Sequence, residues 1–277
     1  MPKKGDKKPL VGDLDDPESL VVWARRYVEH LRVRGYAPTT IVSTEGRLQL
    51  FVAWAHDRGI ARPQEVSKAI LEAYQRTLFY FRKHNGKPLS FGAQRQRVQS
   101  LRTFFRWLAK GNVINANPAS ELELPRAEKR LPRAILSERE AEQVLAVPDL
   151  SDPIGLRDRA MIEVLYSTGL RRAELANLDL VDLDTDRGTL TVRLGKGRKD
   201  RIVPIGERAL LWVHRYLDEV RPWLVVPPDD GFLFLDDQGE KLHLPRITQL
   251  MRRYLLASKV GKPGSVHIWR HTMATLM

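Results

Sequence analysis

The sequence of 277 residues contains no cysteine, which excludes disulfide bonds, thiolate metal sites and cysteine nucleophiles. No apolar run approaches the roughly 18 residues that a membrane-spanning helix needs. The N-terminal stretch MPKKGDKKPLVGDLDD has the positive charge of a signal peptide but lacks its apolar segment, so residues 1–16 are predicted to be a flexible basic tail. These three absences predict a soluble protein of the cytoplasm.

Acidic residues are scarce in one half of the chain only. The sequence has 46 Lys and Arg against 34 Asp and Glu, a net charge of +12. Residues 1–136 hold 25 of the basic and 13 of the acidic side chains, which leaves 21 of each in the remainder. The whole excess of positive charge therefore lies in the first half, where it favours a polyanionic partner such as DNA.

Long segments without internal proline, each closed near a glycine, predict a helical first half. We expect four helices, at residues 17–33, 38–56, 63–83 and 90–110. In the last of them, Val98, Leu101, Phe105 and Leu108 recur at three- and four-residue spacing. This spacing predicts one apolar face that packs on the other helices.

The fourth helix also carries basic side chains on a separate face. Arg95, Arg102 and Arg106 fall within roughly 40° of one another around the helix axis. Between Phe81 and Lys110 there are eight Lys and Arg and no acid, although like charges at helical spacing repel. Such a stripe is usually a solvated surface, but the missing acids favour contact with DNA phosphates here. The candidate contacts in this half are Arg95, Arg102, Arg106, Lys83 and Lys87.

A change of composition marks a boundary in the middle of the chain. Three prolines with mixed charges between residues 118 and 132 predict an extended linker. Ser137 with Glu140 three residues later forms a capping box that starts the next helix. We therefore expect a helical DNA-binding domain at residues 17–120, a linker at 121–136 and a second domain at 137–277.

The second half mixes helices with strands. The segment DPIGLRDRAMIEVLYSTG predicts an amphipathic helix that ends at Gly169, and RGTLTVRLGKGRKDRIVPIG predicts a β-hairpin around a glycine-containing turn. Further helices are expected at residues 207–220 and 244–258, with a short strand GFLFL between them. The fold class is therefore mainly α, with a helical first domain and an α+β second domain that carries a small hairpin sheet.

Three short clusters contain side chains suited to phosphate chemistry: TGLRRAEL, LGKGRKDR and HIWRHT. Each is weak alone, because an arginine pair at a helix start, a tight glycine turn and a His-x-x-Arg pair are common surface features. In this order, after a basic helical half, they resemble the motifs of the tyrosine recombinase (phage integrase) family, most closely the Xer-type recombinases. The resemblance extends from about residue 17 to residue 277 and includes the linker.

The resemblance implies site-specific breakage and rejoining of DNA through a 3′-phosphotyrosyl intermediate, without metal, cofactor or nucleotide. It also implies a SAM-like core-binding first domain, a DNA recombination site as the partner, and a homo- or hetero-tetramer on DNA. The catalytic residues that it implies are Arg171, Lys196, His267 and Arg270. Two arginines can clamp the charge of the phosphorane-like transition state, and a lysine can protonate the leaving 5′-oxygen.

Supporting roles follow from the same motifs. Glu174 lies three residues after Arg171 on one helix face and can hold its guanidinium, although an ordinary helix ion pair is the alternative. Arg171 is preferred to Arg172 because the arginine of the family directly follows Gly-Leu. His271 matches the second histidine of the family's box. Further candidate DNA contacts in the hairpin are Lys199 and Arg201.

The nucleophile of the family has no counterpart in this sequence. In the family, a Leu-Gly-His segment and then the tyrosine follow the His-x-x-Arg box, but no tyrosine of this sequence does: Tyr27, Tyr36, Tyr74, Tyr80, Tyr166, Tyr216 and Tyr254 all precede it. We therefore expect a C-terminally incomplete fragment that lacks its nucleophile and does not cut DNA. The alternatives are a natural short form that occupies recombination sites without cleaving them, and a generic basic DNA-binding module, which would not explain the three clusters.

Overall fold

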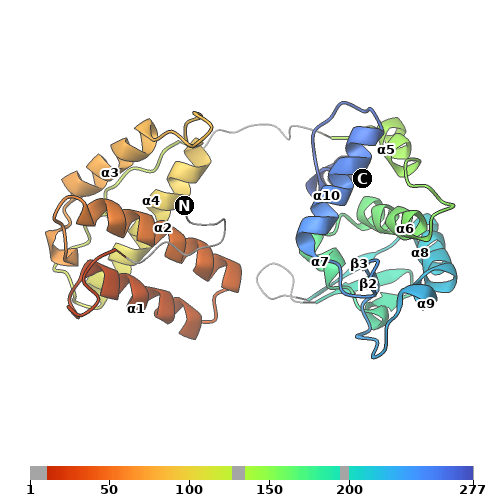
Figure 1. The fold of residues 1–277 in the computed structure, drawn as a ribbon, viewed down its shortest axis with the longest axis horizontal. Helices are drawn as coiled ribbons and strands as arrows, with labels where there is room; N and C mark the ends of the chain where they lie inside the picture. The colour runs from red at the N-terminus through yellow and green to blue at the C-terminus, as the bar shows by residue number, and fades with distance from the viewer. Residues whose placement is uncertain (1–10, 127–134, 194–199, 277) are drawn as a thin grey trace. The chain divides into compact units, whose positions relative to one another are not determined.

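The computed structural model describes residues 11–126, 135–193 and 200–276. These residues form two compact units, which lie within Met1–Lys129 and Arg130–Met277 (Figure 1). Helices dominate both units, and the described strands belong to the second, so the predicted fold class is confirmed. Within the described ranges, no helix is long and apolar enough to cross a membrane.

The first unit is a bundle of four α-helices in which α4 contacts the other three. Its elements are α1 (Leu20–Val33), α2 (Pro38–His56), a 3-10 turn (Pro63–Glu65), α3 (Lys68–Tyr80) and α4 (Phe91–Lys110). The apolar face predicted on α4 is confirmed, because Val98, Leu101, Phe105 and Leu108 are all buried. They form one core with Phe51 of α2, which is also buried.

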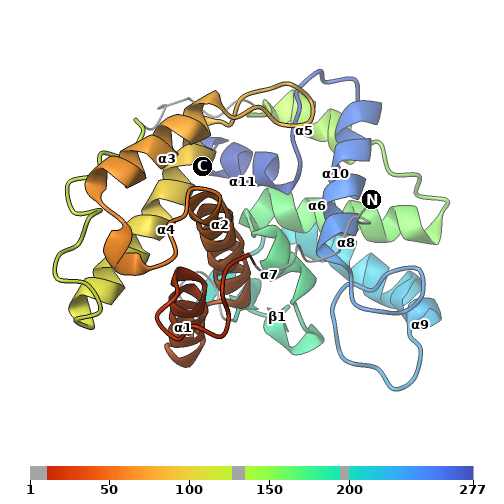
Figure 2. The same cartoon turned by 60° about the vertical axis from the view of Figure 1, so that its left-hand side comes forward.

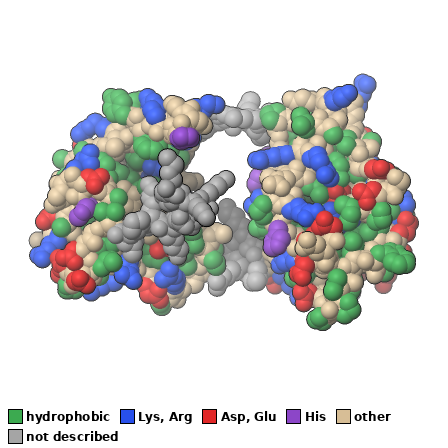
Figure 3. Space-filling view, in the orientation of Figure 1, with side chains coloured by type: hydrophobic (Ala, Val, Ile, Leu, Met, Phe, Trp, Pro, Cys, Tyr) green, Lys and Arg blue, Asp and Glu red, His purple; other side chains and the backbone are tan. Residues whose placement is uncertain are grey.

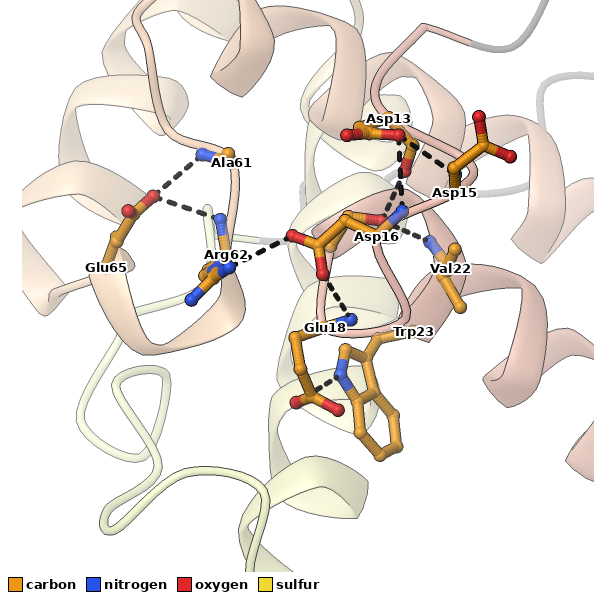
Figure 4. Close-up of polar contacts among 10 residues, drawn as sticks. Asp13, Asp15, Asp16, Glu18, Val22, Trp23, Ala61, Arg62 and Glu65 are labelled. Atoms are coloured by element: carbon orange, nitrogen blue, oxygen red, sulfur yellow. Dashed lines mark hydrogen bonds and ion pairs between the residues drawn. The ribbon is translucent and has the colours of Figure 1, made fainter.

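The turn before α1 is held by acidic side chains, as Figure 4 shows. Asp13 accepts hydrogen bonds from two backbone N–H groups that follow it, and Arg62 pairs with Asp16 at 3.3 Å. The hydroxyl of Ser19 then accepts a hydrogen bond from the first turn of α1, so the helix starts three residues later than predicted. Residues 11–16, which were predicted to belong to a flexible tail, are thus tied to the bundle.

The segment 63–83 is not the single helix that the sequence predicted. A 3-10 turn comes first, and Ser67 then caps α3 through its side chain. The residues after α3 form a small hairpin, in which Arg82 and Pro88 are bridge partners. The Arg82 guanidinium donates to three main-chain carbonyls at the end of α3. This arginine therefore ends the helix and fixes the start of the hairpin.

The second unit places α6 at its centre, in contact with α5, α8 and α11 (Figure 2). Its helices are α5 (Glu138–Leu145), α6 (Pro153–Thr168), α7 (Arg172–Ala176), α8 (Glu207–Glu219), α9 (Arg221–Leu224), α10 (Leu244–Ala257) and α11 (Val266–Leu276). A 3-10 turn (Leu180–Asp182) leads into an antiparallel sheet of order β1-β2-β3. The strands are β1 (Leu183–Asp184), β2 (Thr189–Val192) and β3 (Arg201–Pro204).

Local signals in the second half predicted the helix ends well but not the burial of α6. The capping box is confirmed, since the N–H of Ser137 donates to Glu140 Oε2 at 2.7 Å and the N–H of Glu140 donates to Ser137 Oγ at 3.3 Å. The end of α6 at Gly169 is also confirmed. However, α6 is buried almost all round rather than amphipathic, because neighbours cover its polar side as well. There Arg157 and Asp158 are fully buried and pair with each other at 2.6 Å.

The segment GFLFL is not the regular strand that the sequence predicted. In the described part of the chain it makes two isolated bridges, one through Phe232 and one through Leu235. Arginine side chains take the carbonyls that a strand would offer to its neighbour: Arg221 donates to Phe232 O at 2.8 Å and Arg157 donates to Leu235 O at 2.9 Å. Guanidinium groups therefore satisfy this buried backbone in place of a ladder.

Candidate active site

The turn between α6 and α7 joins two of the predicted catalytic arginines. Gly169 has a left-handed backbone (φ 58°), and a Cβ at this position would lie 2.5 Å from the terminal methyl of Met273 on α11. Arg270, also on α11, donates from Nη1 to the Gly169 carbonyl at 2.7 Å. Arg171 follows the glycine by two residues. The fold therefore brings Arg171 and Arg270, which come from distant parts of the sequence, to one turn.

Glu174 contacts Arg171 through both backbone and side chain. The backbone N–H of Arg171 donates to Glu174 Oε2 at 2.8 Å, and its Nη1 donates to Oε1 at 2.8 Å. The Glu174 side chain is 6% exposed and the Arg171 side chain 36%. The contact that the sequence predicted is present, with a buried carboxylate behind a partly exposed guanidinium.

A second arginine, Arg201 at the start of β3, pairs with the same carboxylate. Its Nη1 donates to Glu174 Oε1 at 2.9 Å and its Nη2 donates to Oε2 at 2.7 Å, a two-pronged contact. Burial alone would raise the pKa of Glu174, but hydrogen bonds from Arg201 and from Arg171 outweigh it and lower this pKa from 4.5 to about 2. Glu174 is therefore an anion at neutral pH. The sequence placed Arg201 among the DNA contacts, whereas the structure places its guanidinium on Glu174.

His267 and His271 occupy exposed positions of α11. His267 precedes Arg270 by about one helical turn, so both side chains come from the same side of the helix. The two histidines line a groove of about 1120 Å³ with α10 and the loop that connects it to α11. Lys262 anchors that loop by donating to the carbonyl of Ile135 at 2.7 Å. No group of three or more His, Asp or Glu side chains in the described ranges is arranged to hold a metal ion.

Arg172, the neighbour that the sequence reasoning set aside, has a different partner. Its Nη1 donates to Thr248 Oγ1 of α10 at 2.6 Å, so it joins α7 to α10. Arg171 is therefore held by the carboxylate of Glu174, whereas Arg172 is held by the hydroxyl of Thr248. Lys, Arg and His side chains of the second unit gather on the side that carries α7 and α10 (Figure 3).

Two predicted hairpin residues, Lys196 and Lys199, lie outside the described residues. On either side of them β2 and β3 are paired antiparallel, from Thr189 with Pro204 to Val192 with Arg201. This pairing confirms the predicted hairpin. The roles of Lys196 and Lys199 stay predictions.

The tyrosines of the second unit are engaged in its packing. Tyr216 is fully buried and accepts a hydrogen bond from a backbone N–H at 3.1 Å, and Tyr254 donates to Asp158 at 2.6 Å. Tyr166 packs edge-on against Trp269, with ring centroids 5.8 Å apart. Burial is the largest cause that raises the pKa of all three phenols, to about 12 for Tyr254. These three phenols are thus engaged in the packing of the second unit rather than free to attack a bound phosphate.

The predicted phosphate contacts of the first unit come from two elements. Arg102 and Arg106 lie on α4, half-buried and exposed respectively. Arg95 is exposed and donates to a main-chain carbonyl of the predicted linker at 3.1 Å. Lys83 and Lys87 are exposed and belong to the hairpin before α4, where the N–H of Lys83 donates to the carbonyl of Lys87 at 2.9 Å. The cations of this unit thus extend from α4 onto the hairpin.

Sequence reasoning missed the pairing of Arg201, although the hairpin contained a signal for it. Side chains alternate along a strand, so Arg201 and Val203 share one face of β3 while Ile202 takes the other. Ile202 is 70% exposed, which leaves Arg201 and Val203 on the inner face. A charged side chain on an inner face requires a charged partner. That rule points to an acid, but it does not select Glu174.

Comparison with solved structures and with known families agrees with this fold. A lambda integrase fragment, solved as a dimer bound to a core site, matches with a TM-score of 0.69 at 19% identity, over 93% of this chain and 89% of that one. The Tn1549 transposon integrase, solved with a circular intermediate DNA, gives 0.71 at 19% identity, over 92% and 85%. Residues 134–277 match the phage integrase family. The chain belongs to this family, the tyrosine recombinases.

Individual relatives place the similarity among the Xer-type members of the family. Tyrosine recombinase XerC 2 of Ralstonia nicotianae is 48% identical over 280 aligned residues, which cover all of this chain and 79% of the relative. Tyrosine recombinase XerD of Pseudomonas putida is 34% identical over 242 residues, or 87% of this chain and 78% of the relative. The chain is therefore Xer-like, and its class of activity is site-specific DNA recombination.

Proposed function

We propose that the arginines of this chain serve a reaction that breaks and rejoins the strands of a specific DNA site through a 3′-phosphotyrosyl intermediate, with the tyrosine supplied from outside these 277 residues. The observation that carries the proposal is the Gly169 turn, where the Arg270 guanidinium is bonded and from which Arg171 follows. Two permanently charged, forked donors at one turn suit a phosphate whose oxygens gain negative charge in the transition state. Glu174, low in pKa and buried, supplies the fixed anion that orients one of them.

Each side chain has a defined task in the proposed reaction. A tyrosine hydroxyl that these 277 residues do not supply loses its proton to water and attacks phosphorus, and the bond from phosphorus to the 5′-oxygen breaks. Arg171 and Arg270 bind the non-bridging oxygens, and Lys196 gives its proton to the leaving 5′-oxygen. His267 donates a hydrogen bond to a phosphate oxygen, with His271 as its support. In the reverse step a 5′-hydroxyl attacks the phosphotyrosyl link, returns a proton to Lys196 and releases the tyrosine oxygen, which takes up a proton from water.

The first unit supplies affinity for the duplex in this proposal. Its candidate phosphate contacts are Arg95, Arg102, Arg106, Lys83 and Lys87, with Lys199 added from the hairpin of the second unit. Phosphate contacts release condensed counterions, so binding should weaken steeply as salt rises. Binding that does not respond to salt would contradict this part of the proposal.

Assembly on DNA completes the proposal. Lambda integrase has been solved as a dimer on a core site and as a tetramer on a Holliday junction. We extend such an assembly to this protein as a homo- or hetero-tetramer on two recombination sites. Because the substrate would be intracellular DNA, we place the protein in the cytoplasm.

The 277-residue polypeptide by itself should bind DNA without cutting it. The tyrosines of its second unit are buried or packed, and no tyrosine follows the His-x-x-Arg motif. A chimera provides the active counterpart: the part of the Ralstonia nicotianae relative beyond the match, on its C-terminal side, is appended to residue 277. The two proteins then differ only in the appended segment.

The test uses duplexes that bind tightly, selected from a random-sequence pool with the 277-residue chain. A set of these duplexes, each nicked at a different position, is incubated with both proteins and analysed for covalent protein–DNA adducts. The chimera should form an adduct for at least one nick position, and the 277-residue chain should form none. An adduct on the 277-residue chain would show that this chain has its own nucleophile, contrary to the proposal. If neither protein forms an adduct, the proposed chemistry is contradicted.

A further inference from the structure

Both oxygens of the Glu174 carboxylate are fully used by two arginines. Oε1 accepts from Arg171 Nη1 and Arg201 Nη1, at 2.8 and 2.9 Å. Oε2 accepts from the backbone N–H of Arg171 and from Arg201 Nη2, at 2.8 and 2.7 Å. The carboxylate thus meets Arg201 with a complete fork and Arg171 with one guanidinium nitrogen plus the main chain.

This asymmetry decides which arginine is available for a phosphate. An arginine and a carboxylate that meet alone favour the two-pronged pair. Arg201 occupies that position on Glu174, so Arg171 gives it one guanidinium nitrogen and keeps its other donors. One anion against two guanidinium groups leaves the cluster with a net positive charge. An incoming phosphate therefore meets an arginine that is oriented but not neutralised.

Arg201 also connects two parts of the candidate site. It is the first residue of β3, and Glu174 lies in α7, the helix that begins directly after Arg171. Its two hydrogen bonds to Glu174 therefore fix the end of the hairpin against the start of α7. Its side chain is 34% exposed, close to the value of Arg171, while the carboxylate between them is 6% exposed.

We infer that Arg201 is a positioning residue, which acts through Glu174 to keep Arg171 aimed at the scissile phosphate. The inference rests on the proposed function of Arg171. It replaces the direct DNA contact that the sequence suggested for Arg201. Arg201 affects the reaction on DNA whether it positions Arg171 or contacts DNA directly. Only the positioning role requires Glu174.

The test measures single-turnover adduct formation by the chimera on its selected nicked duplex, at saturating DNA. Arg201→Gln should lower the rate by about 10²-fold, the usual cost of misplacing a catalytic group by about 1 Å. Arg201→Lys should recover little, because an ammonium keeps the charge without the fork. DNA affinity should stay within about 2-fold of the parent for both variants, since neither removes a proposed phosphate contact.

The matched control is Arg193→Gln. Arg193 follows β2 in the same hairpin and also makes an ion pair, but with Asp182 at 2.7 Å. Loss of this pair should leave the rate of adduct formation unchanged. If Arg193→Gln slows cleavage as much as Arg201→Gln does, general damage to the hairpin explains both, and the specific role of Arg201 is overturned.

A double-mutant cycle separates positioning from direct contact. If Arg201 acts only through Glu174, adding Arg201→Gln to Glu174→Gln should cost less than about 2-fold further, because the interaction is already lost. A full additional loss in the double variant, or a fall in DNA affinity with Arg201→Lys, would make Arg201 a direct contact and overturn the inference. The fold of each variant is checked by hydrogen exchange of the α6 amides. If Arg201→Gln does not fold, the same comparison is made with Arg201→Lys.

Arg171→Ala is the reference that keeps the two proposals apart. If Arg171→Ala abolishes cleavage while both Arg201 variants cleave at the parental rate, the inference fails and the proposed function stands. If Arg171→Ala cleaves normally, the proposed function fails, and the inference with it. Loss of cleavage in both, with the non-additive cycle, is the expected result.

Discussion

The two units use their basic side chains in different ways. In the first, the eight Lys and Arg between Phe81 and Lys110 have no acidic residue among them in the sequence, and the ion pairs that the structure gives for this unit lie elsewhere. In the second, arginines are held by carboxylates: Arg157 by Asp158, Arg159 by Glu163, Arg201 by Glu174 and Arg221 by Asp229. A surplus of charge attracts a polyanion from any direction, whereas a paired guanidinium has one fixed orientation.

We propose that this difference separates affinity from chemistry. An unbalanced, exposed charge acts over about a Debye length and weakens with salt. A guanidinium held by a buried carboxylate contributes little net attraction, but it presents its donors in a defined geometry. In this proposal, the second half has no net charge because its arginines are paired with carboxylates. Those carboxylates fix the orientation of the guanidinium groups.

The largest effect should come from removing one arginine at the Gly169 turn. In the chimera, Arg171→Ala and Arg270→Ala should each lower the rate of adduct formation by about 10²–10³-fold, as the loss of one transition-state donor does elsewhere. Adducts are counted on denaturing gels over time. Arg172→Ala is the matched control, because its guanidinium bonds Thr248 instead. An equal loss in the control would mean that the cleavage defect reflects damage to α7.

A smaller effect is expected on stability when the shared carboxylate loses its charge. The pKa of Glu174 is lowered from 4.5 to about 2 in the folded protein, so its contribution is present above pH 4.5 and is lost as the pH falls to 2. Glu174→Gln should therefore destabilise the second unit by about 2 kcal/mol at pH 7, and the difference from wild type should shrink between pH 4.5 and 2. Urea unfolding at pH 7, 4 and 3 measures it.

The control for that experiment is a carboxylate in an exposed pair. Glu219 meets Arg215 on the surface of α8 at 2.9 Å, with both side chains well exposed. Glu219→Gln should leave the free energy of unfolding at pH 7 nearly unchanged, because an exposed ion pair is screened by water. A Glu174→Gln effect as small as the control would show that the two arginines on Glu174 contribute nothing to stability.

The smallest effect should come from the first unit. Arg102→Gln combined with Arg106→Gln should weaken binding about tenfold at moderate salt and lower the slope of log affinity against log salt by about 2. Fluorescence anisotropy with the 277-residue chain over a range of salt concentrations measures both quantities. Arg215→Gln is the control, since it removes one charge from a paired site in the other unit. An unchanged slope in the double variant would exclude Arg102 and Arg106 from the phosphate contacts.

The sequence predicted most of the elements because their signals are local. The bounds of α2, the capping box at Ser137 and the end of α6 at Gly169 each depend on residues a few positions apart. The hairpin of β2 and β3 was predicted from alternation around a glycine turn, and the three motif clusters gave the family. These features could be read from neighbouring residues alone.

The failures share one cause, which is a partner distant in sequence. GFLFL has the composition of a strand, but Arg157 and Arg221 take its carbonyls. The polar side of α6 was expected to face solvent, yet Arg157 and Asp158 are buried there, where they bond Leu235 O and the Tyr254 hydroxyl of later elements. The pairing of Arg201 with Glu174 was not predicted, because that acid lies in another element. Charged residues with tertiary partners are thus the least predictable part of this site.

The most direct measurement of this division between the units is the rate of adduct formation by the chimera as a function of DNA concentration, with two variants compared side by side. The double variant at Arg102 and Arg106 should need more DNA for half-saturation but reach the parental maximal rate. Arg171→Ala should saturate at the parental DNA concentration with a maximal rate about 10²–10³-fold lower. If both variants change the same parameter, the two units do not divide affinity and chemistry between them, and this account is wrong.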